Sequence, residues 1–472
     1  MIPRRVDAVL RHPILGVALV YVLGIALRLE YTLNVHPPEA FISSDMNLYV
    51  SLARKLASSN EPLMPWDVTH PLGYPALLAF LLSGGGSLAR VVDLQIVVSS
   101  LVPLAVGLLG AAAFGRRTAL AAVAFASLYF PFIEYGALFL SEIHFILWFT
   151  LAFAGFFGAL HARRRGISLA LAAAGGLALS IAAALKSVAL LAALAFFAAD
   201  ALALAVSRAR DGSSWRARLA PWLLRGVVVA VAAAPLLGVL ARVCTRANRG
   251  HFCVTGNKVG SDFLLGHYGP IADIAWAPDE GHGFQFGSPG SYLRHYEIHE
   301  RVPFPMTDNA ANTAEAWRWI FAHPFDAVVL SLDHLYDTFF GVAMWPTYST
   351  TGWQYAHLSQ YVFVLFLFVP TLLACVGIAK RGARAIATSH TALVLSPIVA
   401  LAVTVGIATG EVRYRIPFDV FFIAVVCALV VGDVARDSFT SSTFGYPRKP
   451  ARHEPEDLAA APKLEDAAGL DR

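Results

Sequence analysis

Asp45 is the first residue of this chain whose type and position could do chemistry. It follows two serines and opens the stretch DMNLYVSLARKL, in which Leu48, Leu52 and Leu56 recur at the spacing of one helix face. An amphipathic helix of this kind lies along a membrane surface. Ser44 or Asp45 could cap its N-terminus, where the helix dipole favours negative charge. Asp45 could equally act as a general base, and the two roles are compatible because a capping carboxylate stays ionised and fixed.

A second group of ionisable residues lies in the stretch GEVRYRIP, just before the last long apolar run. Arg413 and Arg415 present forks of N–H donors that suit phosphate, and Tyr414 lies between them. Charged side chains near membrane depth are costly and usually face a cavity or an anionic partner. We therefore expect this stretch to bind an anionic lipid headgroup. The alternative is a pair of interfacial arginines whose long side chains reach the water.

Glu142 and Lys186 each stand at the end of an apolar run. Glu142 lies in LFLSEIHF, and Lys186 separates two long apolar stretches. A lysine between hairpin helices on the outer side departs from the positive-inside trend, so contact with a phosphate is its functional interpretation. A structural hydrogen bond or interface anchoring explains each residue about as well. Function is favoured because Asp45, Glu142, Lys186 and Arg413 all fall on one face of the expected topology.

These residues belong to a chain that is too apolar to be soluble. Of its 472 residues, 57% are hydrophobic and 14% charged, and its mean hydropathy is +0.60. A water-soluble protein of this size could not bury so much apolar surface, so we expect a polytopic membrane protein. The net charge of +4 is modest. The arginines cluster between apolar runs, which is a topology signal and argues against nucleic acid as a partner.

Ten apolar segments predict an all-α fold with about ten transmembrane helices. They are residues 13–33, 89–114, 118–133, 138–160, 167–185, 187–206, 221–243, 358–378, 391–408 and 416–435. The segment PLGYPALLAFLL, between the first two, is about a dozen residues long. It is too short to span and is expected to be re-entrant or shallow. No cleavable signal peptide is evident.

Basic patches fall on one side of this map and mark it as cytoplasmic. They lie at residues 4–11, 116–117, 163–165, 208–218 and 380–384. The other side carries a first external loop, 34–88, and a larger polar region, 244–356, which we expect to be a small external domain. The chain thus divides into an N-terminal transmembrane module (1–243), that domain, C-terminal transmembrane helices (357–435) and a disordered cytoplasmic tail (436–472).

The four cysteines divide into two pairs by position. Cys375 and Cys427 lie in predicted spans, where packing is their expected role. Cys244 and Cys253 lie at the start of the external domain, in a compartment that permits a disulfide. A bridge and two unlinked thiols fit the sequence equally well.

The order of several short motifs resembles the GT-C glycosyltransferases, a superfamily that includes protein O-mannosyltransferases and lipid A aminoarabinose transferases. After the first span come SSD, a Y-x-x-x-A run that begins at Tyr49, and THPLGYPALLAFL, which contains His70. The LSE that ends at Glu142, the terminal RYRIP and an AEAW stretch leading to His323-Pro324 are similar to motifs of bacterial members. The resemblance covers about residues 14–431.

The resemblance implies a GT-C-like fold with an active site on the external face. An acidic residue of the first external loop is essential in that superfamily, which makes Asp45 the candidate general base. Many members have two adjacent carboxylates there, whereas Met46 follows Asp45 here. Glu142 could supply a remote second carboxylate and is the other candidate catalytic residue. The donor would be a sugar on a polyprenyl phosphate, and its expected ligands are Lys186, Arg413, Tyr414, Arg415 and His70.

The implied chemistry is direct displacement at the anomeric carbon, which inverts its configuration. The acceptor would be a glycan, a lipid or a protein. No cofactor is expected beyond the lipid-linked donor, no residue is assigned to a metal, and a divalent metal is not expected. Tyr49, His267 and Tyr268 are the expected acceptor or sugar ligands. Further aromatic candidates of the external domain are Trp276, Tyr292, His295 and Tyr296, with ordinary packing as the alternative.

Two other functions fit the same features. A transporter or flippase of lipid-linked sugars would use the same charges, but transporters often show internal repeats, and none is visible in this sequence. A non-catalytic membrane subunit of glycan assembly is the other. Arginine used in preference to lysine and abundant alanine suggest a bacterial source. We therefore expect a multi-pass protein of the bacterial inner membrane with its active site facing the periplasm.

Overall fold

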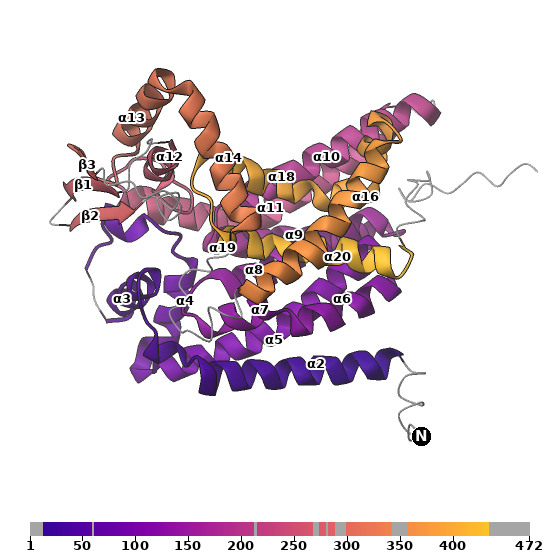
Figure 1. The fold of residues 1–472 in the computed structure, drawn as a ribbon, viewed down its shortest axis with the longest axis horizontal. Helices are drawn as coiled ribbons and strands as arrows, with labels where there is room; N and C mark the ends of the chain where they lie inside the picture. The colour runs from indigo at the N-terminus through magenta and orange to yellow at the C-terminus, as the bar shows by residue number, and fades with distance from the viewer. Residues whose placement is uncertain are drawn as a thin grey trace, which may run out of the picture.

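Long apolar helices make up most of the structure, a computed structural model that describes residues 13–58, 61–211, 215–267, 273–279, 282–287, 299–341 and 357–433. The helices of the bundle are α2 (Pro13–Glu30), α5 (Leu88–Ala113), α6 (Arg116–Leu128), α8 (Glu142–His161), α9 (Arg165–Leu185), α10 (Val188–Asp211), α11 (Trp215–Ala247), α16 (Val369–Ala379), α18 (His390–Ile407) and α20 (Asp419–Val430). They form a bundle with α2, the indigo helix of Figure 1, along one edge. The predicted tail, 436–472, lies outside the described residues.

Eight helices in the described ranges are long and apolar enough to cross a membrane, and one bent pair of helices makes a ninth candidate. The predicted all-α polytopic class is therefore confirmed. The last of the ten predicted spans, 416–435, is not among these candidates. Its helix, α20, has 12 residues and continues directly from the short helices α19 (Val412–Arg415) and η8 (Ile416–Phe418). Nearly all of its side chains are buried inside the bundle.

The third predicted span is the bent pair. Helix α6 is followed by α7 (Phe130–Glu134) and the turn η5 (Tyr135–Ala137), at an angle of 62°. The guanidinium of Arg28, on α2, donates to the carbonyls of Ala126 and Ser127 at the end of α6 and to the carbonyl of Ser99. The last carbonyls of a helix have no partner within it. Arg28 therefore stabilises the bend by satisfying them inside the bundle.

Helix α8 lies at the centre of the core. Phe149 and Phe153 on α8 make edge contacts with the ring of Phe421 on α20. Helices α8 and α9 pack closely because Gly155 faces Gly175, and a Cβ added at Gly155 would lie 2.9 Å from the Gly175 Cα atom. Small residues at helix interfaces permit such close approach. This rigid frame brings the first residue of α8 and the last residue of α9 to the same end of the bundle.

The two ends of the bundle differ in charge. The turns from α5 to α6, from α8 to α9, and from α16 to α17 (Ala383–Thr388) carry the basic residues 116–117, 163–165 and 380–384. At the opposite end, α8 and α10 begin and α9 and α18 finish. We call these the basic end and the loop end. Figure 1 places α3, α4, α12 and the strands beyond the loop end.

The first loop-end segment is mostly helical. The π-turn η1 (Tyr31–Val35) and the 3-10 turn η2 (Pro38–Ala40) extend α2, and α3 (Asp45–Ser58) is the amphipathic helix predicted from the sequence. The 3-10 turn η3 (Pro65–Val68) leads to α4 (Gly73–Leu82) and η4 (Ser83–Gly85). Helix α4 has only 10 residues, as expected for a shallow, non-spanning segment. Gly73 lets it pack against the Ala184 backbone at the end of α9.

The second loop-end segment combines helices with a small sheet. Its helices are α12 (Val259–His267), α13 (Asn309–Ala322) and α14 (Pro324–Phe340). The strands β1 (Asp273–Asp279), β2 (His282–Gly287) and β3 (His299–Val302) form a sheet in the order β2-β1-β3, with β2 antiparallel and β3 parallel to β1. A hydrophobic core of its own includes Leu264, Trp276 and Val302. The sheet was not anticipated from the sequence.

Candidate active site

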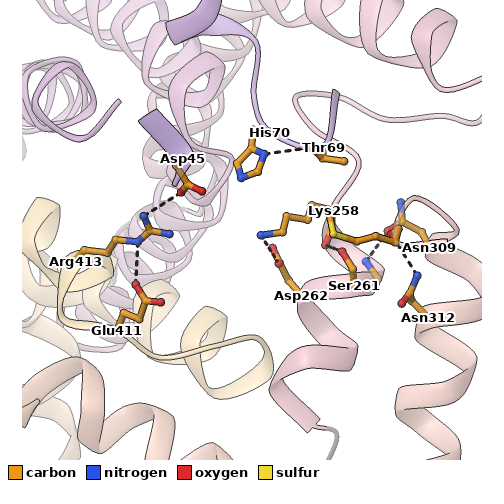
Figure 2. A network of polar contacts seen from close by, with 12 residues as sticks. Asp45, Thr69, His70, Lys258, Ser261, Asp262, Asn309, Asn312, Glu411 and Arg413 are labelled. Carbon is orange, nitrogen blue, oxygen red and sulfur yellow. Dashed lines mark hydrogen bonds and ion pairs between the residues drawn. The ribbon is translucent and has the colours of Figure 1, made fainter. Parts of the chain in front are cut away.

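A cavity at the loop end collects most of the predicted site residues. Its volume is about 200 Å³. Most of its polar lining comes from α3 (Asp45, Tyr49), the segment after η3 (Thr69, His70), α8 (Glu142), the turn between α9 and α10 (Lys186), α12 and the residue before it (Asp262, Lys258) and the short helix α19, Val412–Arg415 (Arg413, Tyr414). Figure 2 shows several of these side chains converging from segments far apart in the sequence.

Arg413 is held between two carboxylates. Its Nη1 atom donates to Asp45 Oδ2 at 3.1 Å, and its Nε atom lies 3.0 Å from Glu411 Oε2 (Figure 2). Asp45 lines the cavity, whereas Glu411 does not. The side chains are largely buried, with exposed fractions of 10% for Arg413 and 19% for Asp45. The predicted base and the predicted phosphate ligand are thus in direct contact.

Glu142 and Lys186 form a second ion pair, 2.9 Å long, across the loop ends of α8 and α9. The Oε2 atom of Glu142 is buried and makes no hydrogen bond within the described residues, so it can accept from a ligand hydroxyl. The ring of Tyr414 lies between two cations, 5.8 Å from Lys186 Nζ and 5.2 Å from the Arg413 guanidinium carbon. Cation–π contacts of this kind hold the cations in place.

Lys258 is a third cation of the cavity, and it was not among the predicted site residues. Its Nζ atom pairs with Asp262 one turn further on, at 3.2 Å (Figure 2). The sequence held one signal for it. Lys258 is a lysine on the external side of the predicted topology, the same departure from the positive-inside trend that singled out Lys186.

The segment that carries Lys258 is anchored to the first loop-end segment. The backbone N–H of Asn257 donates to the Val68 carbonyl at 2.7 Å, and its side chain bonds to those of Asn248 and Asn309. A disulfide joins Cys244, near the end of α11, to Cys253. The structure thus forms the bridge that the sequence left open. Because Val68 is followed by Thr69 and His70, these contacts fix Lys258 relative to the cavity wall.

His70 faces the cavity as a neutral ring. Its Nδ1 atom is 3.2 Å from the Thr69 hydroxyl, and the ring lies edge-on to Tyr49. Burial and the nearby charge of Lys258 lower the pKa of His70 to about 4. At neutral pH it can therefore donate a hydrogen bond to a phosphate, but it cannot pair with one as a cation.

The charged residues keep one another ionised. Burial alone would raise the pKa of the Asp45 carboxyl, but Arg413, with Lys258 in support, holds it well below its usual range. Burial also works against the charge on Lys258, and Asp262 raises the pKa of that lysine above its usual value. Burial raises the pKa of Glu411, against the opposing effect of Arg413. The site is a network of opposite charges in which Lys186 and Lys258 each pair with one carboxylate and Arg413 contacts two.

Backbone strain lies next to Asp45. Ser44 has φ +45°, in the left-handed region that side-chain-bearing residues rarely adopt. Helix α3 begins with Asp45 itself, and the Asp45 carboxylate binds Arg413 across the cavity. The strained residue directs the first side chain of the helix toward α19. Such strain clusters at functional sites.

One wall of the cavity is apolar. It is formed by Leu401 and Val405 of α18 and by Ala408 directly after that helix, with Val188 of α10 nearby. Helices α10 and α18 are both candidate membrane spans. One wall of the cavity thus carries charged side chains, and the other is formed by helices long enough to span a membrane. A ligand with a charged head and a hydrocarbon chain matches such a cavity. Within the described ranges, no group of three or more His, Cys, Asp or Glu side chains could hold a metal ion.

Arg415 does not reach the cavity, although the sequence grouped it with Arg413. Its Nε atom is 3.0 Å from Asp419 Oδ1, its Nη1 atom donates to Gln360 Oε1 at 2.8 Å, and its guanidinium lies over the ring of Phe363. Asp419 also accepts a hydrogen bond from Tyr129. The predicted donor contact of Arg415 is replaced by a buried network inside the bundle.

Of the aromatic residues predicted for the external domain, the two that the structure describes, His267 and Trp276, do not line the cavity. His267 is buried, with its Nδ1 atom 3.0 Å from the Phe263 carbonyl. Trp276 belongs to the core of the domain and donates from Nε1 to Asn312 at 2.7 Å. For these two residues packing explains the position. Tyr268, Tyr292, His295 and Tyr296 lie outside the described residues.

No family model matches the sequence, and no curated protein matches it. Three solved structures of one archaeal enzyme have a similar course of the chain. The oligosaccharyltransferase AglB from Archaeoglobus fulgidus, in complex with an inhibitory peptide and a dolichol-phosphate, has a TM-score of 0.48 and 12% identity, over 89% of this chain and 50% of that one.

The same oligosaccharyltransferase tethered to an acceptor peptide has a TM-score of 0.47 and 10% identity, over 92% of this chain and 52% of that one. Its apo form has a TM-score of 0.47 and 12% identity, over 88% and 50%. The chain thus spans about half the length of these enzymes. At these scores the likeness carries nothing about donor, acceptor or mechanism.

Proposed function

We propose that this protein is a membrane glycosyltransferase that moves a sugar from a polyprenyl phosphate to an acceptor hydroxyl or amine. The observation that supports it most is the cavity itself, in which the Asp45 carboxylate stands beside three cations, Lys186, Lys258 and Arg413. The apolar wall of α18 suits the first part of a polyprenyl chain. The motif order that resembles GT-C glycosyltransferases points to the same activity.

In the proposed reaction the acceptor oxygen or nitrogen attacks the anomeric carbon while Asp45 takes its proton. The bond from the anomeric carbon to the phosphate oxygen breaks, and polyprenyl phosphate leaves with one more negative charge. Direct displacement inverts the anomeric configuration. A positioned general base contributes about 10²–10⁴-fold to such a rate. The leaving group, polyprenyl phosphate, is an anion, so the cations of the cavity are the groups that stabilise it.

The cations stabilise the leaving phosphate because they are placed before charge develops on it. Arg413 offers a planar fork, and Lys186 is held toward the same space by Glu142. Glu142 is the second carboxylate of the proposed site. Its free Oε2 atom suits a hydroxyl of the sugar or the acceptor. His70 and Tyr49 supply neutral hydrogen-bonding and ring surfaces beside them.

We further propose that the loop end faces the periplasm of a bacterial inner membrane. Two observations support this side. The arginine-rich turns at 116–117, 163–165 and 380–384 lie at the other end, as the positive-inside trend requires of a cytoplasmic face. The disulfide between Cys244 and Cys253 lies at the loop end and suits an oxidising compartment.

A transfer assay with Asp45→Asn tests the proposal. Purified protein in lipid nanodiscs is given a radiolabelled polyprenyl-phosphate sugar and an envelope extract as acceptor source, and sugar released from the lipid is counted. We expect the variant to be slower by about 10²-fold or more. Glu39→Gln, a change in an exposed carboxylate of the first external loop, is the matched control and should leave the rate unchanged.

Transfer by Asp45→Asn at the wild-type rate would remove Asp45 from the mechanism. Wild-type protein in liposomes that moves the labelled lipid between leaflets and never releases the sugar would identify a transporter. If the wild-type protein shows neither sugar transfer nor lipid movement, the result would favour a non-catalytic subunit.

A further inference from the structure

Arg413 meets its two carboxylates from different sides. Asp45, which lines the cavity, contacts the Nη1 atom, and Glu411, which does not line it, contacts the Nε atom. Figure 2 shows the arginine between them, with Asp45 from α3 on one side and Glu411 from the segment before α19 on the other. The two contacts involve different nitrogen atoms of one planar guanidinium.

A phosphate that enters the cavity reaches the same face of Arg413 that Asp45 occupies. Arginine binds phosphate through pairs of its N–H groups, so phosphate and Asp45 compete for the Nη side of the fork. Glu411 does not take part in this competition, because it contacts Nε and does not line the cavity. One carboxylate is therefore exchangeable and the other is not.

We propose that Arg413 exchanges Asp45 for the donor phosphate, and that Glu411 is the positioning residue that holds the guanidinium in place during the exchange. This inference rests on the proposed function and adds the order in which the two substrates bind. The donor binds first, and its phosphate releases the base that the acceptor then needs.

The exchange resolves a conflict within the site. A carboxyl group whose pKa lies well below its usual range is a weak base, and Arg413 is the chief cause of that lowering for Asp45. Once phosphate takes over the guanidinium, burial is the dominant influence left, and it raises the pKa of Asp45. The other groups that interact electrostatically with Asp45 are His70, Lys258, Tyr49 and Glu411. Of these, Lys258 remains as a cation, so the rise is partial. A stronger base speeds proton transfer.

The same exchange also closes the catalytic cycle. After transfer, Asp45 carries the acceptor proton and polyprenyl phosphate carries the additional negative charge. When polyprenyl phosphate leaves, Arg413 returns to Asp45, which favours the ionised carboxylate and expels the proton to water. No further acid or base is needed to reset the site.

Equilibrium binding of a short-chain polyprenyl phosphate, a probe with no sugar to transfer, tests this exchange. Asp45→Asn removes the competitor, so we expect it to bind the probe roughly tenfold more tightly than the wild type. Glu411→Gln leaves Arg413 drawn toward Asp45 without its rear contact, so we expect binding roughly tenfold weaker. Glu411→Asp, which keeps the charge, should recover part of that loss, and Glu39→Gln should match the wild type.

The opposite signs are the signature of the exchange. If the carboxylates acted only through their charge, both variants would bind the phosphate more tightly. If both acted only as structural supports, both would bind it more weakly. Either of these results, or unchanged binding in Asp45→Asn, overturns the inference.

Failure of the inference and failure of the proposed function give different results. A wild-type protein that does not bind polyprenyl phosphate contradicts the proposed function. A wild type that binds it, with two variants shifted in one direction, contradicts the exchange alone. Thermal unfolding of each variant identifies one that does not fold, and Asp45→Ser then replaces Asp45→Asn with the same expected sign.

Discussion

Two arginines only two positions apart, Arg413 and Arg415, have different surroundings in this protein. Residues at positions i and i+2 of a helix do not share a face, and α19 therefore presents Arg413 to the cavity and Arg415 to the interior of the bundle. Their partners differ accordingly. Arg413 contacts the two carboxylates at the cavity, whereas Arg415 contacts Asp419 and Gln360 in a fully buried network. One sequence motif thus contains one candidate ligand and one structural residue.

Arg415→Leu should destabilise the fold without acting on the donor. The change leaves Asp419 buried without its cation, which costs about 3–5 kcal/mol. The double variant Arg415→Leu with Asp419→Leu should recover part of the loss, because it removes both charges together. Thermal unfolding in detergent measures the first effect, and the affinity of the folded fraction for polyprenyl phosphate measures the second. If Arg415→Leu has normal stability but binds polyprenyl phosphate more weakly, Arg415 would be a ligand of the donor rather than a structural residue.

At the scale of elements, His334 on α14 joins the segments that carry the site. Its Nε2 atom is 3.0 Å from the Gly266 carbonyl on α12, and its Nδ1 atom accepts from the Gly410 N–H at 3.3 Å. Burial lowers the pKa of His334, so the ring is neutral and one nitrogen can donate while the other accepts. This contact ties α12, which begins beside Lys258, to the segment that leads into α19 and Arg413.

Gly410→Ala should reduce activity strongly. A Cβ atom at this position would overlap the backbone of His334, so the segment with Glu411 and Arg413 must move away from α14. A displacement of about 1 Å at a catalytic group can cost about 10²-fold in rate. The transfer assay measures this. Gly406→Ala, four residues earlier, is the matched control, because no atom lies within 4 Å of the added Cβ. Equal rates in the two variants would contradict the tight contact.

At the scale of the whole molecule, much of the site was predictable because charges stand out against an apolar sequence. Asp45, Glu142, Lys186 and Arg413 are each isolated at the end of an apolar run, and counting spans places all four at one end. The amphipathic helix α3 and the short helix α4 were also evident from spacing and length.

Other features depend on contacts that a sequence does not display. The bend between α6 and α7 is stabilised by Arg28 from another helix, so hydropathy alone predicts a straight span there. Helix α20 is as apolar as a span but is buried within the bundle, and composition does not separate these cases. Lys258 lies in an aperiodic segment whose position depends on a disulfide and on Asn257.

The disulfide couples the second loop-end segment to the first, and its loss should affect both stability and activity. Cys244 and Cys253 pack in one cluster with Leu52 of α3 and Val68 of η3. Cross-links that close short loops stabilise proteins by about 2–4 kcal/mol. We expect Cys244→Ser with Cys253→Ser to lower the unfolding temperature. The variant should also weaken binding of polyprenyl phosphate, because the segment that carries Lys258 loses one of its two anchors. Cys375→Ala, at an unbridged cysteine, should change neither quantity. A double variant that is less stable but binds the phosphate normally would show that Asn257 alone positions Lys258.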